Sequence, residues 1–199
     1  MKRSVSVVLL ILASASLAFA SSYIGGSISI MKDTYSEDSY KVVFNQVAVS
    51  LEGTSYGSTS GRFGIAYQFG VGSSTPTFET SILSLEGDPT SVLTGSLMGT
   101  VKHILIRDLS LETALGYGYT QSSYEDSSSE TTSRISKIEA KIGAVYELNN
   151  DLVLLGGVRL SIPFSVSKTT KSGSSTTTDT ISLESGSGFG TYIGMAYQY

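Results

Sequence analysis

Bulky apolar residues alternate with small or polar residues along almost the whole chain after residue 20. The clearest segment covers 62–71, where small or polar residues alternate with Phe63, Ile65, Tyr67, Phe69 and Val71. A period of two residues is that of a β-strand, in which successive side chains point to opposite faces of a sheet. No long segment shows the 3.6-residue period of an amphipathic helix. The alternation therefore predicts an all-β protein.

The alternation separates the chain into eight expected strands. These are the segments 22–32, 41–52, 62–71, 91–105, 109–119, 137–146, 152–162 and 187–199. Asn45 interrupts the apolar face of the second strand, so its register is provisional. The segment 82–85 is also compatible with extended structure, and ten strands are the alternative count.

The connections between these strands differ in length. Short segments rich in turn-forming residues occupy 106–108 and 148–151, whereas long polar segments occupy 73–90, 121–133 and 167–186. Short turns that alternate with long loops predict antiparallel up-and-down topology, with the short turns on one rim and the loops on the other.

The less apolar face of the strands carries unusually many small residues. Its members are Gly64, Ala66, Gly70, Ala114, Gly116, Gly118, Gly188, Gly190, Gly194 and Ala196. Small residues suit the narrow interior of an eight-stranded barrel, whereas glycine weakens a strand that faces water. The face composition therefore predicts a transmembrane β-barrel with its bulky rows toward lipid. The alternative is a soluble secreted barrel whose bulky rows point inward and bind an apolar ligand.

The first twenty residues have the features of a secretory signal peptide. Lys2 and Arg3 precede a short apolar core, and Ala18-Phe19-Ala20 supplies a small-x-small cleavage pattern. We expect a cleaved signal helix over 1–20 and one barrel domain over 21–199.

Composition excludes several functional classes. The chain has no Cys and one His, which argues against disulfide scaffolds, thiol catalysis, Cys-ligated zinc and multi-His metal sites. A net charge of -4 and a pI near 5.0 argue against a nucleic-acid-binding protein. We expect no enzyme, no metal and no cofactor. His103, the single imidazole, is expected at the membrane interface on the periplasmic side.

Charged residues fall on the face that is expected to line the lumen. The predicted lumen charge network comprises Arg62, Lys102, Glu112, Lys137, Glu139, Lys141 and Arg159, with Glu52 as a further acid. Paired charges that fill a narrow lumen are the favoured interpretation, because unpaired buried charges are costly. A selectivity ring for a small polar solute is the alternative.

The last strand carries the most specific pattern. Ile193, Met195, Tyr197 and Tyr199 occupy alternate positions, and the chain ends on the last of them. This segment resembles the C-terminal assembly signal of bacterial outer-membrane proteins, in which a terminal Phe is commoner than Tyr. The resemblance implies recognition by the outer-membrane insertion machinery.

Residues 22–199 as a whole resemble small eight-stranded outer-membrane barrels of the opacity and adhesion type. This resemblance implies a monomer in the bacterial outer membrane, in contact with its lipid. Long Ser/Thr-rich loops would then face outward, toward an unknown extracellular partner. The expected role is structural or in surface interaction, with a narrow pore for ions or small polar solutes as the alternative.

Overall fold

The structure is a computed structural model that describes residues 22–37, 40–57, 62–80, 83–126, 129–173, 175–181 and 185–199. The predicted signal peptide lies outside these residues. Among the described residues, no helix is long and apolar enough to cross a membrane.

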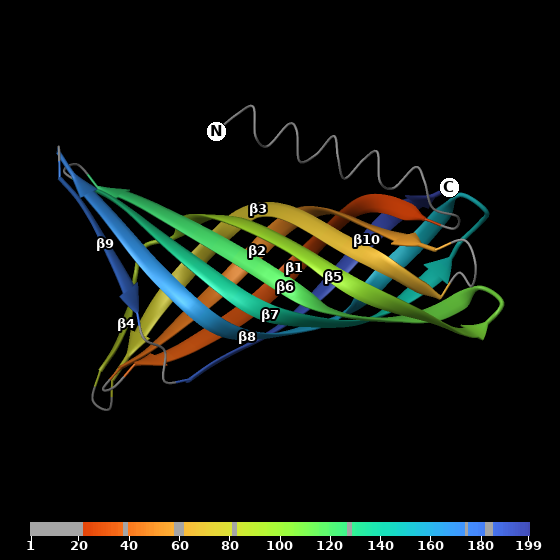
Figure 1. Cartoon of the computed structure of the whole chain (residues 1–199), viewed down its shortest axis with the longest axis horizontal. Helices are drawn as coiled ribbons and strands as arrows, with labels where there is room; N and C mark the ends of the chain where they lie inside the picture. Colours follow the sequence, from red (N-terminus) through yellow and green to blue (C-terminus); the bar gives the residue numbers. More distant parts are fainter. Residues whose placement is uncertain are drawn as a thin grey trace.

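The described chain folds into antiparallel β-strands. In chain order they are β1 (Tyr23–Glu37), β2 (Tyr40–Tyr56), β3 (Phe63–Glu79), β4 (Ser84–Glu86), β5 (Thr90–Ile106), β6 (Leu109–Asp126), β7 (Ser129–Glu147), β8 (Leu152–Ser172), β9 (Ser175–Ile181) and β10 (Ser185–Gln198). Eight of them form a closed ring in the order β1-β2-β3-β5-β6-β7-β8-β10, because β10 pairs with both β8 and β1 (Figure 1). The predicted eight-stranded barrel is confirmed.

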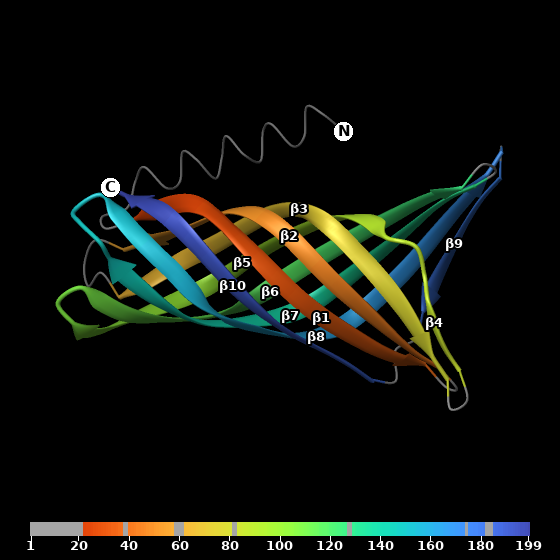
Figure 2. The same ribbon diagram turned by 180° about the vertical axis from the view of Figure 1, so that it is seen from behind.

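The two remaining strands are additions to single hairpins. The short β4 pairs with the last residues of β3, and β9 pairs with the last part of β8, from Val166 to Ser172. Both lie at the barrel end opposite the one where β1 begins and the chain finishes (Figure 2). We call these two ends the far end and the terminal end. The two extra strands lengthen the far end without entering the ring.

The two predicted short turns lie at the terminal end. Residues 107–108 join β5 to β6, and residues 148–151 join β7 to β8. In the second turn, the Asn149 side-chain oxygen accepts hydrogen bonds from the backbone N–H groups of Asp151 and Leu152, each at 2.9 Å. A side chain that satisfies two turn donors explains why asparagine favours this position.

The strand faces are those predicted from the alternation. Ala66, Ala114 and Ala196 are buried inside the ring, whereas Ile193, Leu115 and Ile162 are at least 61% exposed on its outside. Tyr67 is an exception, because this outward residue is buried. Tyr67 pairs with Gly53 on β2, and a Cβ at Gly53 would lie 2.5 Å from the Tyr67 hydroxyl oxygen. The aromatic side chain of Tyr67 therefore covers Gly53.

The predicted long loops were wrong in extent, because strands occupy most of these segments. The segment 121–133 contains the end of β6 and the start of β7, which pair as far as Asp126 and Ser129. The segments 73–90 and 167–186 likewise contain strand ends together with β4 or β9. Polar residues predominate on both faces there, so the apolar alternation stops although the backbone ladder continues. Hydrogen bonding between strands does not require an apolar face.

Candidate functional site

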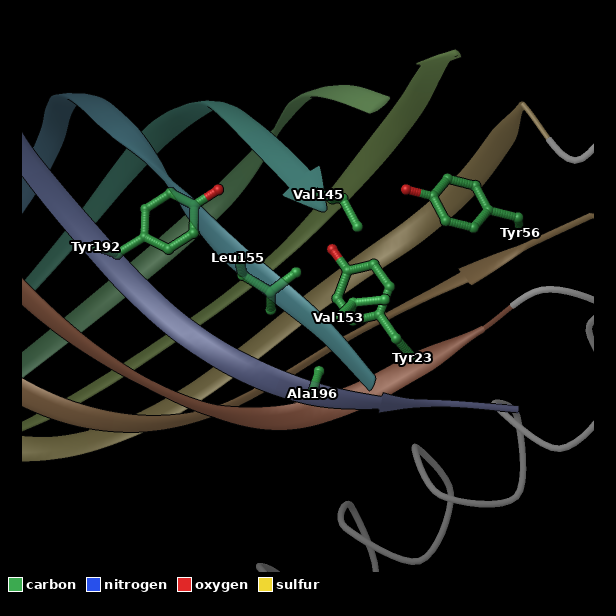
Figure 3. Close-up of a cluster of buried hydrophobic side chains, with 7 residues drawn as sticks. All are labelled: Tyr23, Tyr56, Val145, Val153, Leu155, Tyr192 and Ala196. Carbon is green, nitrogen blue, oxygen red and sulfur yellow. The ribbon is translucent and has the colours of Figure 1, made fainter. Parts of the chain in front are cut away.

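The lumen is closed at the terminal end by a layer of aromatic and aliphatic side chains. Figure 3 shows its members, which come from five strands: Tyr23, Tyr56, Val145, Val153, Leu155, Tyr192 and Ala196. The Tyr23 hydroxyl donates to Glu112 Oε2 at 2.7 Å, and the Tyr56 hydroxyl donates to the same oxygen. The layer is therefore anchored to the charges that lie next to it.

A group of paired charges fills the lumen beside this layer. The Lys141 ammonium lies 3.1 Å from Glu112 Oε1 and 3.4 Å from Glu52 Oε2. The Arg159 guanidinium lies 3.2 Å from Glu52 Oε2 and 3.4 Å from Glu139 Oε1. All five side chains are at most 4% exposed. Because a buried charge is tolerated only when it is paired, these contacts hold the opposite walls of the ring together.

An aromatic ring supports both cations of this group. The Lys141 ammonium and the Arg159 guanidinium each lie 4.8 Å from the centre of the Tyr192 ring. A cation near an aromatic face is attracted to the negative charge of the π system. Tyr192 is therefore a common contact of the two bases that reach across the lumen.

A further ion pair lies nearer the far end. Asp33 on β1 accepts hydrogen bonds from Lys137 at 3.3 Å, Gln46 at 2.9 Å and Ser161 at 2.8 Å. We call Asp33, Glu52, Glu112, Lys137, Glu139, Lys141 and Arg159 the charge cluster.

Asp33 was not predicted as a lumen residue, because the expected first strand ended at residue 32. The available signal was its position, two residues after the inward Met31 in the same alternation. Extending the inward register by one more step would have found it.

The remaining predicted site residues lie outside this cluster. Lys102 lies at the terminal end, 3.5 Å from Glu147 and over the Tyr56 ring at 5.6 Å. Arg62 is exposed, because it precedes the first residue of β3 and so lies beyond the wall. His103 is exposed on β5 near the terminal end. The structure thus brings together Glu112, Lys137, Glu139, Lys141 and Arg159 and leaves Arg62 and Lys102 apart.

The charge cluster leaves little room in its own part of the lumen. A gap of about 20 Å³ lies beside Lys137, Glu139 and Arg159, which is space for a single water molecule. Within the described part of the chain, no three His, Cys, Asp or Glu side chains are grouped to hold a metal ion. The cluster is therefore suited to closing the lumen.

No protein-family model and no curated protein matches this sequence. Solved structures do match its fold. The outer-membrane protein OprG from Pseudomonas aeruginosa superposes with a TM-score of 0.65 at 14% identity, covering 91% of this chain and 97% of that one. The chain has the fold of a small outer-membrane β-barrel.

Two further barrels support the same conclusion about the fold. AlkL, determined by solid-state NMR in lipid bilayers, matches with a TM-score of 0.61 at 14% identity, over 91% of this chain and 90% of that one. Ail of Yersinia pestis, in complex with a heparin analogue, matches with a TM-score of 0.51 at 14% identity, over 91% of this chain and all of the other. At this level of identity, the likeness concerns the architecture of the barrel alone.

Proposed function

We propose that this protein is a monomeric, non-enzymatic integral protein of the bacterial outer membrane, with a closed lumen and a role in surface interaction at its far end. The observation that carries the proposal is the pairing of an apolar outer surface with a charged, closed interior. A soluble barrel would bury its bulky rows, whereas Ile28, Val49 and Leu160 are 46–59% exposed on the outside.

The apolar outer surface ends at polar residues toward the far end. Toward the far end, its apolar positions give way to Lys32 and Asn45, which are paired neighbours on β1 and β2. Phe189 on β10 pairs with Lys32 at the same level. Aromatic rings beside the last apolar positions are typical of the interface between lipid tails and headgroups. Asn45, which interrupts the predicted apolar face, marks the edge of this apolar surface.

Cell fractionation combined with a heat-shift gel tests the location. We expect the protein in the outer-membrane pellet, with different gel mobilities before and after boiling, because folded barrels resist detergent at room temperature. N-terminal sequencing of the mature protein is expected to begin at Ser21. Recovery in the soluble periplasmic fraction without a heat shift would contradict the proposal.

Planar-bilayer recording tests whether the lumen is closed. The wild-type protein is expected to insert without conductance steps, because the charge cluster and the layer of aromatic and aliphatic side chains fill the cross-section of the lumen. Conductance steps that change when Arg159 is replaced by Ala would instead support a narrow pore. Insertion is verified in the same sample by the heat shift.

The C-terminal strand is proposed to act as the assembly signal. Tyr199 exchanges two backbone hydrogen bonds with Ser22, at 2.9 and 3.1 Å, so the last residue lies beside the start of the barrel. We expect Tyr199→Ala to slow insertion into vesicles that contain the insertion machinery, while spontaneous folding in detergent is unchanged. Tyr146→Ala is the matched control, because Tyr146 is also an exposed outer tyrosine near the terminal end. Equal slowing by both variants would contradict the assignment.

A further inference from the structure

The residues that line the lumen become apolar on the side of the charge cluster that faces the far end. On β1 the inward residue after Asp33 is Tyr35, and on β2 the inward residue next to Gln46 toward the far end is Phe44. Ile135 holds the corresponding position above Lys137 on β7, paired with Val166 on β8. One inward step thus replaces a layer of charges with a layer of apolar side chains.

These apolar residues form a floor across the ring. Tyr35, Ile135 and Val166 are buried and packed together, with Phe44 against them. The rings of Tyr35 and Phe44 meet edge to face, with their centres 5.5 Å apart. We call these four residues the apolar floor, and they lie between the charge cluster and the far end.

A hollow of about 400 Å³, which we call the cup, lies on the side of this floor that faces the far end. Its walls include Val42, Pro76 and Phe78 together with the floor residues, and hydroxyl side chains such as Ser133 complete the lining. Asp88 and Lys168 also border it, so the charged lining residues are one acid and one base. The volume lies in the range of small-molecule sites, which are concave and mostly apolar.

The lining determines what this hollow can hold. Apolar surface in contact with water is unfavourable, so an apolar occupant that displaces this water is stabilised by burial. The bordering charges are of opposite sign and give no net attraction for an ion. The volume corresponds to about a dozen water-sized groups at ~30 Å³ each.

We propose that this cup binds one small, uncharged apolar molecule. Because the apolar floor and the charge cluster close the barrel below, the ligand enters and leaves by the far end without crossing the barrel. That this end faces the outside of the cell rests on the proposed function, whereas binding requires only the folded barrel.

Saturable binding of N-phenyl-1-naphthylamine, whose fluorescence rises in apolar surroundings, tests the proposal. The folded protein is placed in phosphatidylcholine nanodiscs, and empty nanodiscs give the non-saturable uptake by lipid. Wild-type protein is expected to add a saturable component with one site per chain. A titration with no such component overturns the proposal, and because the heat shift independently reports the barrel, this failure is distinct from failure of the proposed function.

Two tryptophan variants locate the site, since the chain has no Trp of its own. Ser133 and Thr132 are adjacent, half-buried residues of β7 on opposite faces, and Ser133 lines the cup. We expect Ser133→Trp to fill the cup and weaken saturable binding by at least about tenfold, whereas Thr132→Trp stays within about twofold of wild type. Equal affinities for the two variants would overturn the assignment.

A second wall variant keeps the test valid if Ser133→Trp fails to fold. Phe78 is 46% exposed, so Phe78→Asp adds a charge to the wall without burying it fully. We expect this variant to show the wild-type heat shift and to lose the saturable component. Retention of wild-type affinity would contradict the proposal.

Discussion

The lumen has two parts that the same strands build. The lower half, toward the terminal end, holds the charge cluster, and the upper half, toward the far end, holds the cup. In the lower half, β7 and β8 place Lys141 and Arg159 inward, and these side chains reach acids on other strands. In the upper half, the same two strands place Ile135, Val166 and Ser133 inward, and a hollow remains. The comparison teaches that, at a constant number of strands, the lumen is filled where inward charges from different strands pair with one another. A hollow remains where the inward residues are mostly apolar or hydroxyl side chains.

The largest expected effect is in the lower half, for Arg159→Ala. This change removes the partner of Glu139 and one partner of Glu52, and a buried carboxylate that loses its partner costs about 3–5 kcal/mol. The free energy of unfolding in urea, measured in lipid vesicles, is expected to fall by that amount. Arg159→Lys retains the charge and is expected to lose less. A fall below about 1 kcal/mol for Arg159→Ala would show that the ion pairs do not hold the lower half together.

The next largest loss of unfolding free energy is expected for a glycine inside the ring, and a glycine on the outside of the ring serves as the comparison. A Cβ at Gly188 would lie 1.9 Å from Asp33 Oδ1 and 2.2 Å from Ser161 Oγ, whereas a Cβ at Gly99 meets only the Leu115 backbone oxygen, at 3.9 Å. We expect Gly188→Ala to destabilise the barrel by about 1–3 kcal/mol. Gly99→Ala, the matched control, is expected to be neutral or to stabilise by about 0.5 kcal/mol. Both are measured by urea unfolding, and equal effects would contradict the crowding at Asp33.

A smaller effect is expected in the upper half, for Phe44→Ala. An enclosed Phe costs about 3–5 kcal/mol on truncation, but Phe44 borders the cup and is only partly buried. We therefore expect a loss of about 1–2 kcal/mol, from burial and from the edge contact with Tyr35. A fall in unfolding free energy as large as that for Arg159→Ala would mean that the two halves do not differ in this way.

The smallest effect is expected for an ion pair on the outside of the far end. Lys171 lies 3.5 Å from Glu130, with the two side chains 57% and 47% exposed. Exposed pairs are screened by solvent, so Lys171→Ala is expected to change the unfolding free energy by less than about 0.5 kcal/mol. The same measurement in high salt is expected to remove this difference. A loss comparable to that of Arg159→Ala would contradict the contrast between buried and exposed pairs.

The alternation was sufficient to predict the ring and the orientation of its faces. It works where one face meets lipid and the other meets a crowded interior, as for Phe63 and Ala66 on β3. It fails near the far end, where Thr131 pairs with Tyr124 in a ladder with polar residues on both faces. Strand length was therefore underestimated wherever the membrane band ends.

The site was predictable only in part, for two physical reasons. Arg62 occupies an inward position in the alternation of β3 but precedes the first residue of that strand. The alternation alone does not reveal where the barrel wall begins. The cup is formed by residues from several strands, including Phe44 on β2, Phe78 on β3 and Val166 on β8. Their proximity depends on the register between strands, which the alternation within each strand does not reveal.

The closing contact between β1 and β10 has a consequence for how the barrel folds. Tyr23 pairs with Gln198, so the seam joins the two residues most distant in sequence among the paired strands. Contacts between distant residues are slow to form, because the chain entropy lost on bringing them together precedes any gain from the contact. Hairpins such as β6–β7 are local, and the seam is expected to be the late, rate-limiting event. An open, partly zippered sheet with an unpaired edge on β1 is then the species most exposed to aggregation before insertion is complete.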